Sequence, residues 1–247
     1  MLGNNRFLLI LTLFTGLLLP EVVAKPLTVI TYQEAPFAEQ AANGNQGLVI
    51  ELLAELFARA EIEYHVVFFP LKRGMALAEQ HTDYCVLPIE RNQQRESRYR
   101  WIGPVMISRY GLYSHQPLKD PLITLEDARK YSIGSFLGSG IGEYLISLGF
   151  KVELTSNAAL NVKKLQRNRI DLWASELISA NWLMKQQRQD LGEPLLVFYT
   201  SLRAMACHNS MPDKQYHALT GALQSMYQDG FMKQLHDKYS TFLERSL

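Results

Sequence analysis

The chain has 247 residues, and its 25 basic and 24 acidic side chains leave a formal net charge of +1. Such a balance provides no electrostatic attraction for nucleic acid or for an anionic membrane surface, so we expect no nucleic-acid partner. Hydrophobic residues make up 47% of the chain, which is enough for the cores of an ordinary globular protein.

The first 24 residues have the pattern of a cleavable export signal. Arg6 gives a short positive region, residues 7–19 are almost wholly apolar, and residues 22–24 offer small side chains where a signal peptidase reads them. The apolar run is shorter than the roughly 20 residues that span a bilayer, so a membrane anchor is the weaker alternative. We expect a periplasmic protein whose mature chain begins at Lys25.

The two cysteines, Cys85 and Cys207, would both be exported to an oxidising compartment. Exported pairs often form a disulfide, but free cysteine is also common in buried strands. The sequence leaves the two states nearly balanced, with a slight preference for free thiols. The six histidines are scattered and show no zinc-ligand spacing, so we expect neither a structural metal nor a cofactor.

Strand and helix signals alternate along the chain. In the first part, strands are predicted at 27–32, 64–69 and 83–87, with helices after Gly47 and at 75–80. In the middle part, strands are predicted at 131–136, 151–155 and 170–174, with helices after Gly140 and at 158–167 and 177–187. Strands at 195–199 and 204–207 then precede two terminal helices. This alternation predicts βαβ units and mainly parallel sheets with ligands at the strands' C-terminal ends.

Two of these strands are followed by groups of opposite charge. Arg95 follows the strand at 83–87 and a polar bend, and Glu176 follows the strand at 170–174. A guanidinium and a carboxylate on opposite walls of a cleft would match a zwitterion such as an amino acid. The pattern therefore predicts a protein that binds small charged metabolites.

The order of these features resembles the bacterial extracellular solute-binding proteins of family 3, over essentially the whole mature chain. The resemblance is carried by Pro36-Phe37, Gly47-x3-Glu51, the Asp83 strand, Arg95, Trp101-x2-Pro104, Gly138-Ser139 and Asp171-x4-Glu176. It implies two α/β lobes joined by two crossover strands that act as a hinge. Lobe 1 would comprise 25–106 and 202–247, and lobe 2 would comprise 107–201.

The resemblance also implies a ligand site. Arg95 would grip a ligand carboxylate in bidentate geometry, backbone amides at a helix N-terminus would assist it, and Glu176 would meet the ammonium group. The full set of expected ligand-binding residues is Tyr32, Glu34, Phe37, Pro88, Glu90, Arg95, Phe136, Gly138, Ser139, Gly140 and Glu176.

Three departures from the family pattern concern this site. Glu176 stands where Asp is usual, Glu90 stands where a small hydroxyl residue is common, and no stacking aromatic is found near Leu71. The extra methylene of Glu176 would displace its carboxylate by roughly 1.5 Å. The departures indicate a ligand other than a common amino acid, or a repurposed cleft.

Each candidate also has a purely structural interpretation. Arg95 would then be a solvated arginine, and Glu176 a helix-start acid stabilised by the helix dipole. Residues 138–140 would be an ordinary strand-to-helix turn, and Tyr32 and Phe37 would belong to the core.

The function that the resemblance implies is a monomeric, non-enzymatic receptor for a small amino-acid-like carboxylate, working with an ABC permease. One alternative is an enzyme of the same fold, similar to cyclohexadienyl dehydratase, in which Glu34, Glu90 or Glu176 donates a proton after desolvation raises its pKa. Another is a ligand-sensing receptor for a separate membrane signalling partner.

Overall fold

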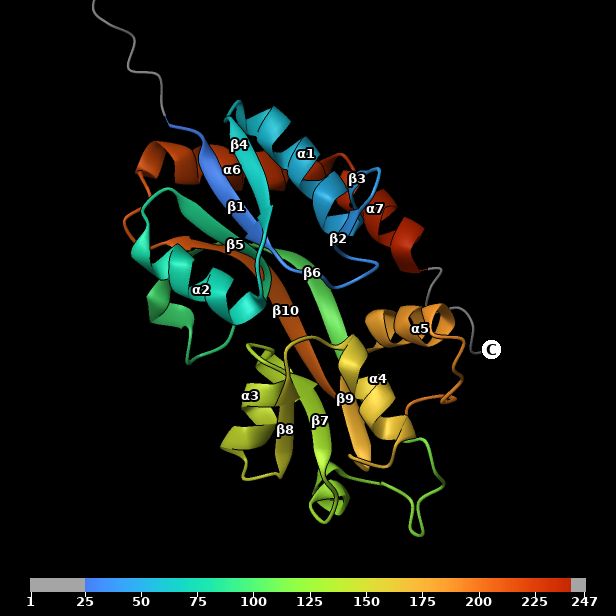
Figure 1. Cartoon of the computed structure of the whole chain (residues 1–247). Helices are drawn as coiled ribbons and strands as arrows, with labels where there is room; N and C mark the ends of the chain where they lie inside the picture. Colours follow the sequence, from blue (N-terminus) through green and yellow to red (C-terminus); the bar gives the residue numbers. More distant parts are fainter. Residues whose placement is uncertain (1–24, 241–247) are drawn as a thin grey trace, which may run out of the picture.

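The computed structural model describes residues 25–240, so the expected export signal at 1–24 lies outside the described residues. The chain folds into two α/β lobes, one above the other in Figure 1, with two long strands running from one lobe into the other. The predicted two-lobed α/β class is confirmed.

One eight-stranded sheet runs through both lobes in the order β4-β1-β5-β10-β6-β9-β7-β8. The first lobe contributes β1 (Leu27–Thr31), β4 (Tyr64–Phe68) and β5 (Tyr84–Glu90), and β1 pairs in parallel with both neighbours. The second lobe contributes β7 (Ile133–Phe136), β8 (Val152–Thr155) and β9 (Leu172–Glu176), again with parallel pairing. The long strands β6 (Tyr99–Tyr113) and β10 (Leu196–His208) are antiparallel to each other and to their outer neighbours. A small hairpin, β2 (Glu39–Ala41) and β3 (Gly44–Gln46), lies outside this sheet.

Helices of the first lobe cover both faces of its part of the sheet. Helices α1 (Leu48–Ala60), α6 (Asp213–Gln228) and α7 (Phe231–Ser240) share one hydrophobic core, and α2 (Leu71–Gln80) packs in another. Leu48, Leu52 and Leu56 of α1 are buried, because leucines at helical spacing fall on one face. The helix ends where Glu61 adopts a left-handed conformation, with φ at 53°.

The second lobe is smaller and has the same layered construction. Helix α3 (Gly140–Ser147) packs in one core, and α4 (Ala159–Gln166) and α5 (Leu177–Gln186) pack in another that contains the buried Trp173. Two short 3₁₀ helices, η1 (Glu96–Arg98) and η2 (Leu125–Ala128), lie in connecting segments. A capping box joins Thr124 and Asp127, and the helix that it starts is a single 3₁₀ turn.

The separate strands predicted at 195–199 and 204–207 are one continuous strand, β10, and this prediction was wrong. The intervening polar residues continue the ladder because β6 pairs with β10 from Leu196 opposite Leu112 to His208 opposite Tyr99. The expected lobe boundaries fall inside β6 and β10 and stay a prediction.

Cys85 and Cys207 form a disulfide bond, so the slight preference for free thiols was wrong. Cys85 lies on β5 directly opposite Cys207 on β10, which brings their Cα atoms to 4.0 Å. The two residues are 122 positions apart, and only the strand register makes them neighbours. The disulfide fixes β10 to the first lobe.

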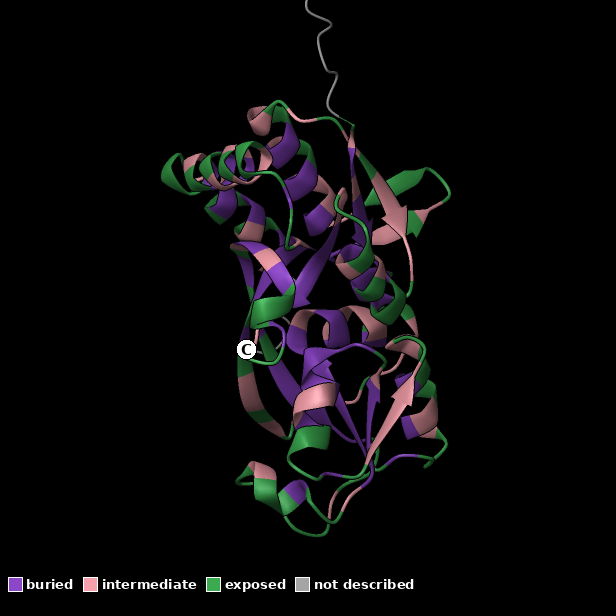
Figure 2. Cartoon of the chain, turned by 90° about the vertical axis from the view of Figure 1, so that its left-hand side faces the viewer, coloured by how far each residue is buried: buried purple, intermediate pink, exposed green. Residues whose placement is uncertain are grey.

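Burial follows the layers of the fold. In Figure 2 the buried residues lie along the strands and on the helix faces turned toward them, and exposed residues lie on the outer helix turns and loops. Among the helices within residues 25–240, none has both the length and the apolar character needed to cross a bilayer.

Candidate functional site

A cavity of about 370 Å³ lies between the two lobes, and we call it the cleft. Tyr32, Glu34 and Phe69 line it from the first lobe, and Phe136 and Asn157 line it from the second. The other lining residues are Gln33, Gln40, Phe68, Pro70, Leu71, Ser156 and Ala158. Most of these residues end or follow parallel strands at their C-terminal ends, where α/β folds bind ligands.

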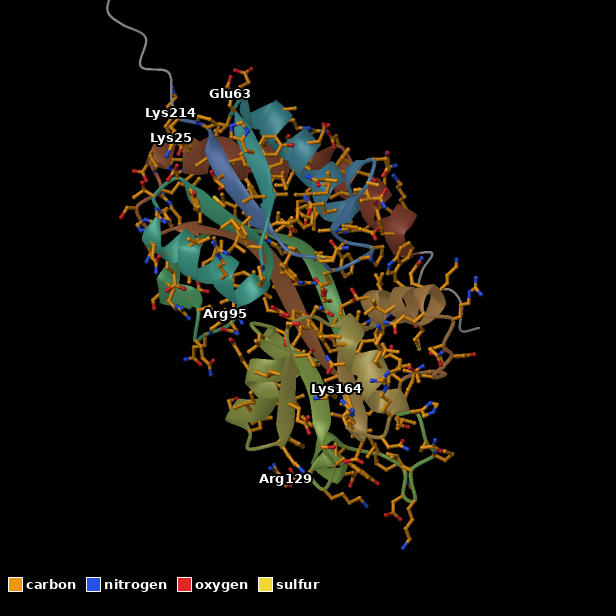
Figure 3. The ribbon with its side chains drawn as sticks, in the orientation of Figure 1. Lys25, Glu63, Arg95, Arg129, Lys164 and Lys214 are labelled. Atoms are coloured by element: carbon orange, nitrogen blue, oxygen red, sulfur yellow. A yellow bond between two sulfur atoms is a disulfide. The ribbon has the colours of Figure 1, made fainter. Side chains whose placement is uncertain are left out.

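Arg95 is buried where the lobes meet, at 1% exposure, and is labelled in Figure 3. One of its terminal nitrogens lies 3.4 Å from a carboxylate oxygen of Glu90 and 3.3 Å from the Glu90 carbonyl oxygen. The other donates to the Gly138 carbonyl at 3.0 Å and to Glu143 at 2.6 Å. The guanidinium therefore connects the first lobe to the start of α3 in the second, while its Nε has no partner.

Glu90 ends β5 and is 2% exposed. Its carboxylate accepts a hydrogen bond from the Tyr110 hydroxyl at 2.7 Å as well as the contact from Arg95. Burial raises the pKa of Glu90, but the positive charges of Arg203 and Arg95 outweigh it and leave the pKa below its ordinary value. Glu90 is therefore an ionised carboxylate inside the protein.

Arg203 lies on β10 and is fully buried. One terminal nitrogen donates to Glu34 at 2.6 Å, to the Pro88 carbonyl at 3.1 Å and to the Tyr32 hydroxyl. Its other two nitrogens are buried without a partner. Our sequence reasoning missed Arg203; the available signal was a cation directly before the apolar run 204–207.

Glu176 is buried and forms the N-cap of α5 by accepting a hydrogen bond from the Ser179 amide at 2.8 Å. Burial raises its pKa to about 8, and the charge of Glu34 contributes in the same direction. The side chain is therefore mostly neutral at pH 7. Its capping position agrees with the helix-start interpretation, and its contact with a ligand ammonium stays a prediction.

The loop at 138–140 presents different groups from those that the resemblance implies. Gly138 has a φ of +85°, which favours glycine, and turns its carbonyl rather than its amide toward Arg95. Ser139 caps α3, since its hydroxyl accepts a hydrogen bond from the Gly142 amide at 3.2 Å. Gly140 lies against the side chain of Glu90.

The aromatic candidates divide between the cleft and the core. Tyr32 and Phe136 line the cleft with ring centroids 6.2 Å apart, whereas Phe37 lies in the core of the first lobe. Phe69, which sequence reasoning did not select, supplies an aromatic wall two residues before Leu71. Arg73 lies over the outer part of this wall, 4.4 Å from the Phe69 ring centroid.

Of the predicted residues, Tyr32, Glu34 and Phe136 line the cleft. Arg95, Glu90 and the loop at 138–140 meet at a second contact between the lobes and do not line the cleft. The ligand contacts of all these residues stay predictions. The contacts that sequence reasoning missed are made by Arg203, Tyr110, Glu143 and Phe69. Within residues 25–240, no group of three or more His, Cys, Asp or Glu side chains is placed to hold a metal ion.

No protein-family profile matches the chain, and no curated protein matches it in sequence. Solved structures do match. A histidine kinase sensor domain with similarity to periplasmic binding proteins superposes with a TM-score of 0.80 at 14% identity, over 87% of this chain and 96% of that chain. The arginine-, lysine-, histidine-binding protein ArtJ from the thermophilic bacterium Geobacillus stearothermophilus gives a TM-score of 0.74 at 16% identity, over 87% and 95%.

An ancestral amino acid-binding protein, AncCDT-1, described as a precursor of cyclohexadienyl dehydratase, gives a TM-score of 0.73 at 16% identity, over 87% of this chain and 95% of that chain. At such identities the similarity establishes the fold alone. The chain has the two-lobed fold of the periplasmic binding proteins.

Proposed function

We propose that the protein is a periplasmic solute-binding protein that captures a small solute in the cleft. The observation that carries this proposal is the cavity of about 370 Å³ whose walls come from both lobes. A solute bound there would contact Tyr32 and Phe69 on one side and Phe136 on the other, so binding would hold the lobes together. Export through a cleaved signal at 1–24 would place the protein in the periplasm.

The sequence predicts that Arg95 holds the carboxylate of an amino-acid-like ligand, but the guanidinium already has carboxylate partners in the protein. A ligand carboxylate would have to replace Glu90 or Glu143 on the guanidinium, or bind its free Nε. The amino-acid-binding neighbours support this ligand class, since ArtJ binds arginine, lysine and histidine.

Calorimetric titration of the purified protein tests the proposal. The panel contains amino acids, small carboxylates and uncharged aromatic amides, and native mass spectrometry of freshly purified protein identifies any solute already bound. We expect at least one panel member to bind and Phe136→Ala to weaken that binding at least about tenfold, since the variant removes one wall of the cleft.

Phe198→Ala is the matched control, because Phe198 is also a half-buried phenylalanine of the second lobe but does not line the cleft. A folded sample that binds no panel member and carries no solute would contradict the proposal. Equal weakening by the two variants would place the binding elsewhere.

Two versions of this function differ in the membrane protein that the solute-bound receptor contacts. An ABC permease would make the protein a transport receptor, and a membrane kinase would make it a sensor, which the sensor-domain neighbour supports. Co-purification of the full chain from membranes, followed by identification of the bound membrane protein, distinguishes them.

An enzymatic alternative rests on Glu176. A buried carboxyl group with a pKa of about 8 is protonated at neutral pH, which a general acid requires. Turnover of a prephenate-like substrate by the wild type, lost in Glu176→Gln, would favour the enzyme over the receptor.

A further inference from the structure

The two buried guanidinium groups beside the cleft are each already neutralised by a carboxylate of the protein. Arg203 pairs with Glu34 at 2.6 Å, and Arg95 pairs with Glu90 at 3.4 Å. All four side chains are buried. In addition, Arg95 contacts the less buried Glu143 at 2.6 Å. The buried charges beside the cleft therefore sum to zero before any solute enters.

Glu90 does not line the cleft itself, but it lies at the nearby start of α3, a position that an incoming anion would favour. A Cβ atom added to Gly140 would lie 2.8–3.0 Å from the Cβ, Cγ and Cδ atoms of Glu90, so the Glu90 side chain lies directly against the first residue of α3. A helix N-terminus attracts negative charge, and here the protein's own carboxylate is placed beside it. The same carboxylate receives the Tyr110 hydroxyl hydrogen bond.

Arg203 occupies the position in which a positively charged group of a solute would bind. Two acceptors of the first lobe that could bind an ammonium group are the Glu34 carboxylate, which lines the cleft, and the Pro88 carbonyl oxygen. Both accept hydrogen bonds from Arg203, at 2.6 Å and 3.1 Å. The remaining acid, Glu176, already accepts the Ser179 amide.

A charged solute would consequently enter the cleft at a cost. It would lose its hydration without gaining an unpaired counter-charge, or break an internal ion pair and leave one of its members buried alone. An anion that bound a partnerless nitrogen of Arg95 or Arg203 would share a guanidinium whose charge a protein carboxylate already balances. An uncharged solute meets no such penalty. Tyr32, Phe69 and Phe136 can cover a flat apolar body, and Gln33, Ser156 and Asn157 offer neutral hydrogen-bonding groups at its edge.

We propose that the cleft selects an uncharged solute with a flat aromatic or apolar body, and that Glu90 and Arg203 exclude free amino acids by occupying the charged positions themselves. This inference rests on the proposed function, because it names the solute class for the same cleft. It departs from the sequence-based prediction that Arg95 binds a ligand carboxylate.

Four probes that share one phenyl group and differ in charge test the inference: 3-phenylpropanamide (neutral), 3-phenylpropionate (anionic), phenethylamine (cationic) and L-phenylalanine (zwitterionic). In calorimetric titration of the wild-type protein, we expect the amide to bind at least about tenfold more tightly than each charged probe, since burying an unpaired charge costs more than about 1.4 kcal/mol.

Glu90→Gln then tests the mechanism, because it removes one internal carboxylate while keeping the side-chain shape. We expect affinity for 3-phenylpropionate to rise at least about tenfold in this variant, so that the preference for the amide over 3-phenylpropionate falls by at least that factor. Glu126→Gln is the control, since Glu126 is exposed in η2, and it should leave all four affinities unchanged.

Tighter binding of L-phenylalanine or 3-phenylpropionate than of the amide by the wild type would overturn the inference while leaving the proposed function intact. Failure of all four probes would overturn the inference as well, and the wider panel with native mass spectrometry would then judge the proposed function separately. Because the wild-type comparison needs no variant, a folding defect in Glu90→Gln would not remove the test.

Discussion

The surroundings of Arg203 and of Arg95 differ in one respect that matters for a hinged protein. The hydrogen-bond partners of the Arg203 side chain, namely Tyr32, Glu34 and Pro88, belong to the first lobe. The partners of Arg95 come from both lobes, with Glu90 in the first and Gly138 and Glu143 in the second. Separation of the lobes would therefore break the contacts of Arg95 with Gly138 and Glu143, and it would preserve all those of Arg203.

The difference teaches that equal burial does not mean an equal role. Arg203 is part of the interior of one lobe, and the disulfide between Cys85 and Cys207 holds its strand to that lobe. Arg95 is buried by the meeting of two lobes, so its burial depends on closure.

The largest expected effect concerns Glu176, a buried acid whose carboxylate accepts the Ser179 amide rather than an arginine. Burial raises its pKa in the folded protein from 4.5 to about 8, so the folded state keeps a proton that the unfolded chain releases. The resulting stability is fully present below about pH 4.5 and is lost as pH rises toward 8. The expected loss is about 5 kcal/mol in the free energy of unfolding.

Urea denaturation of the wild type and of Glu176→Gln over this pH range measures the effect. Glutamine keeps an oxygen that can accept the Ser179 amide but cannot ionise, so the variant should gain stability relative to the wild type as pH rises. The exposed Glu126→Gln should keep a constant difference from the wild type. Parallel curves for Glu176→Gln would mean that Glu176 is not a neutral buried acid.

The next prediction concerns Arg203→Met, which leaves Glu34 buried without its counter-charge. We expect the free energy of unfolding to fall by about 3–5 kcal/mol, and the double variant Arg203→Met/Glu34→Gln to recover part of the loss. Chemical denaturation measures both. The surface variant Arg129→Met, which loses an exposed pair with Glu126, should cost less than about 1 kcal/mol. A cost for Arg203→Met as small as that of Arg129→Met would contradict the comparison.

Local sequence patterns were sufficient for the α/β class, whereas the two-lobed arrangement came from the family resemblance. The alternating strand and helix signals predicted βαβ units because each element buries one face or one stripe. Glu176 at the end of β9 and Arg95 after β5 were also predicted as site residues, because each follows a strand. Both lie near the interlobe region.

The charge pairing of the site could not be predicted because it depends on distant register. Arg203 and Glu34 are 169 residues apart, and Cys85 and Cys207 are 122 apart. On sequence, Glu143 is an ordinary acid in the first turn of a helix, and nothing local indicates that it reaches Arg95 in the other lobe. Local periodicity specifies which face is buried and carries no information about which buried charges meet.

Among the variants of the buried charged groups, Arg95→Met has the smallest expected effect on stability. Its main expected effect is on the overall shape of the molecule. Glu143 is partly exposed and Glu90 keeps its Tyr110 hydrogen bond, so we expect a loss of only about 2 kcal/mol. Without the Gly138 and Glu143 contacts, however, the closed arrangement loses an interlobe connection, and the radius of gyration from solution scattering should increase. Arg203→Met should leave it unchanged, since the Arg203 contacts lie within one lobe. If both variants keep the compact shape, packing along β6 and β10 holds the lobes together, and the distinction between the two arginines does not concern closure.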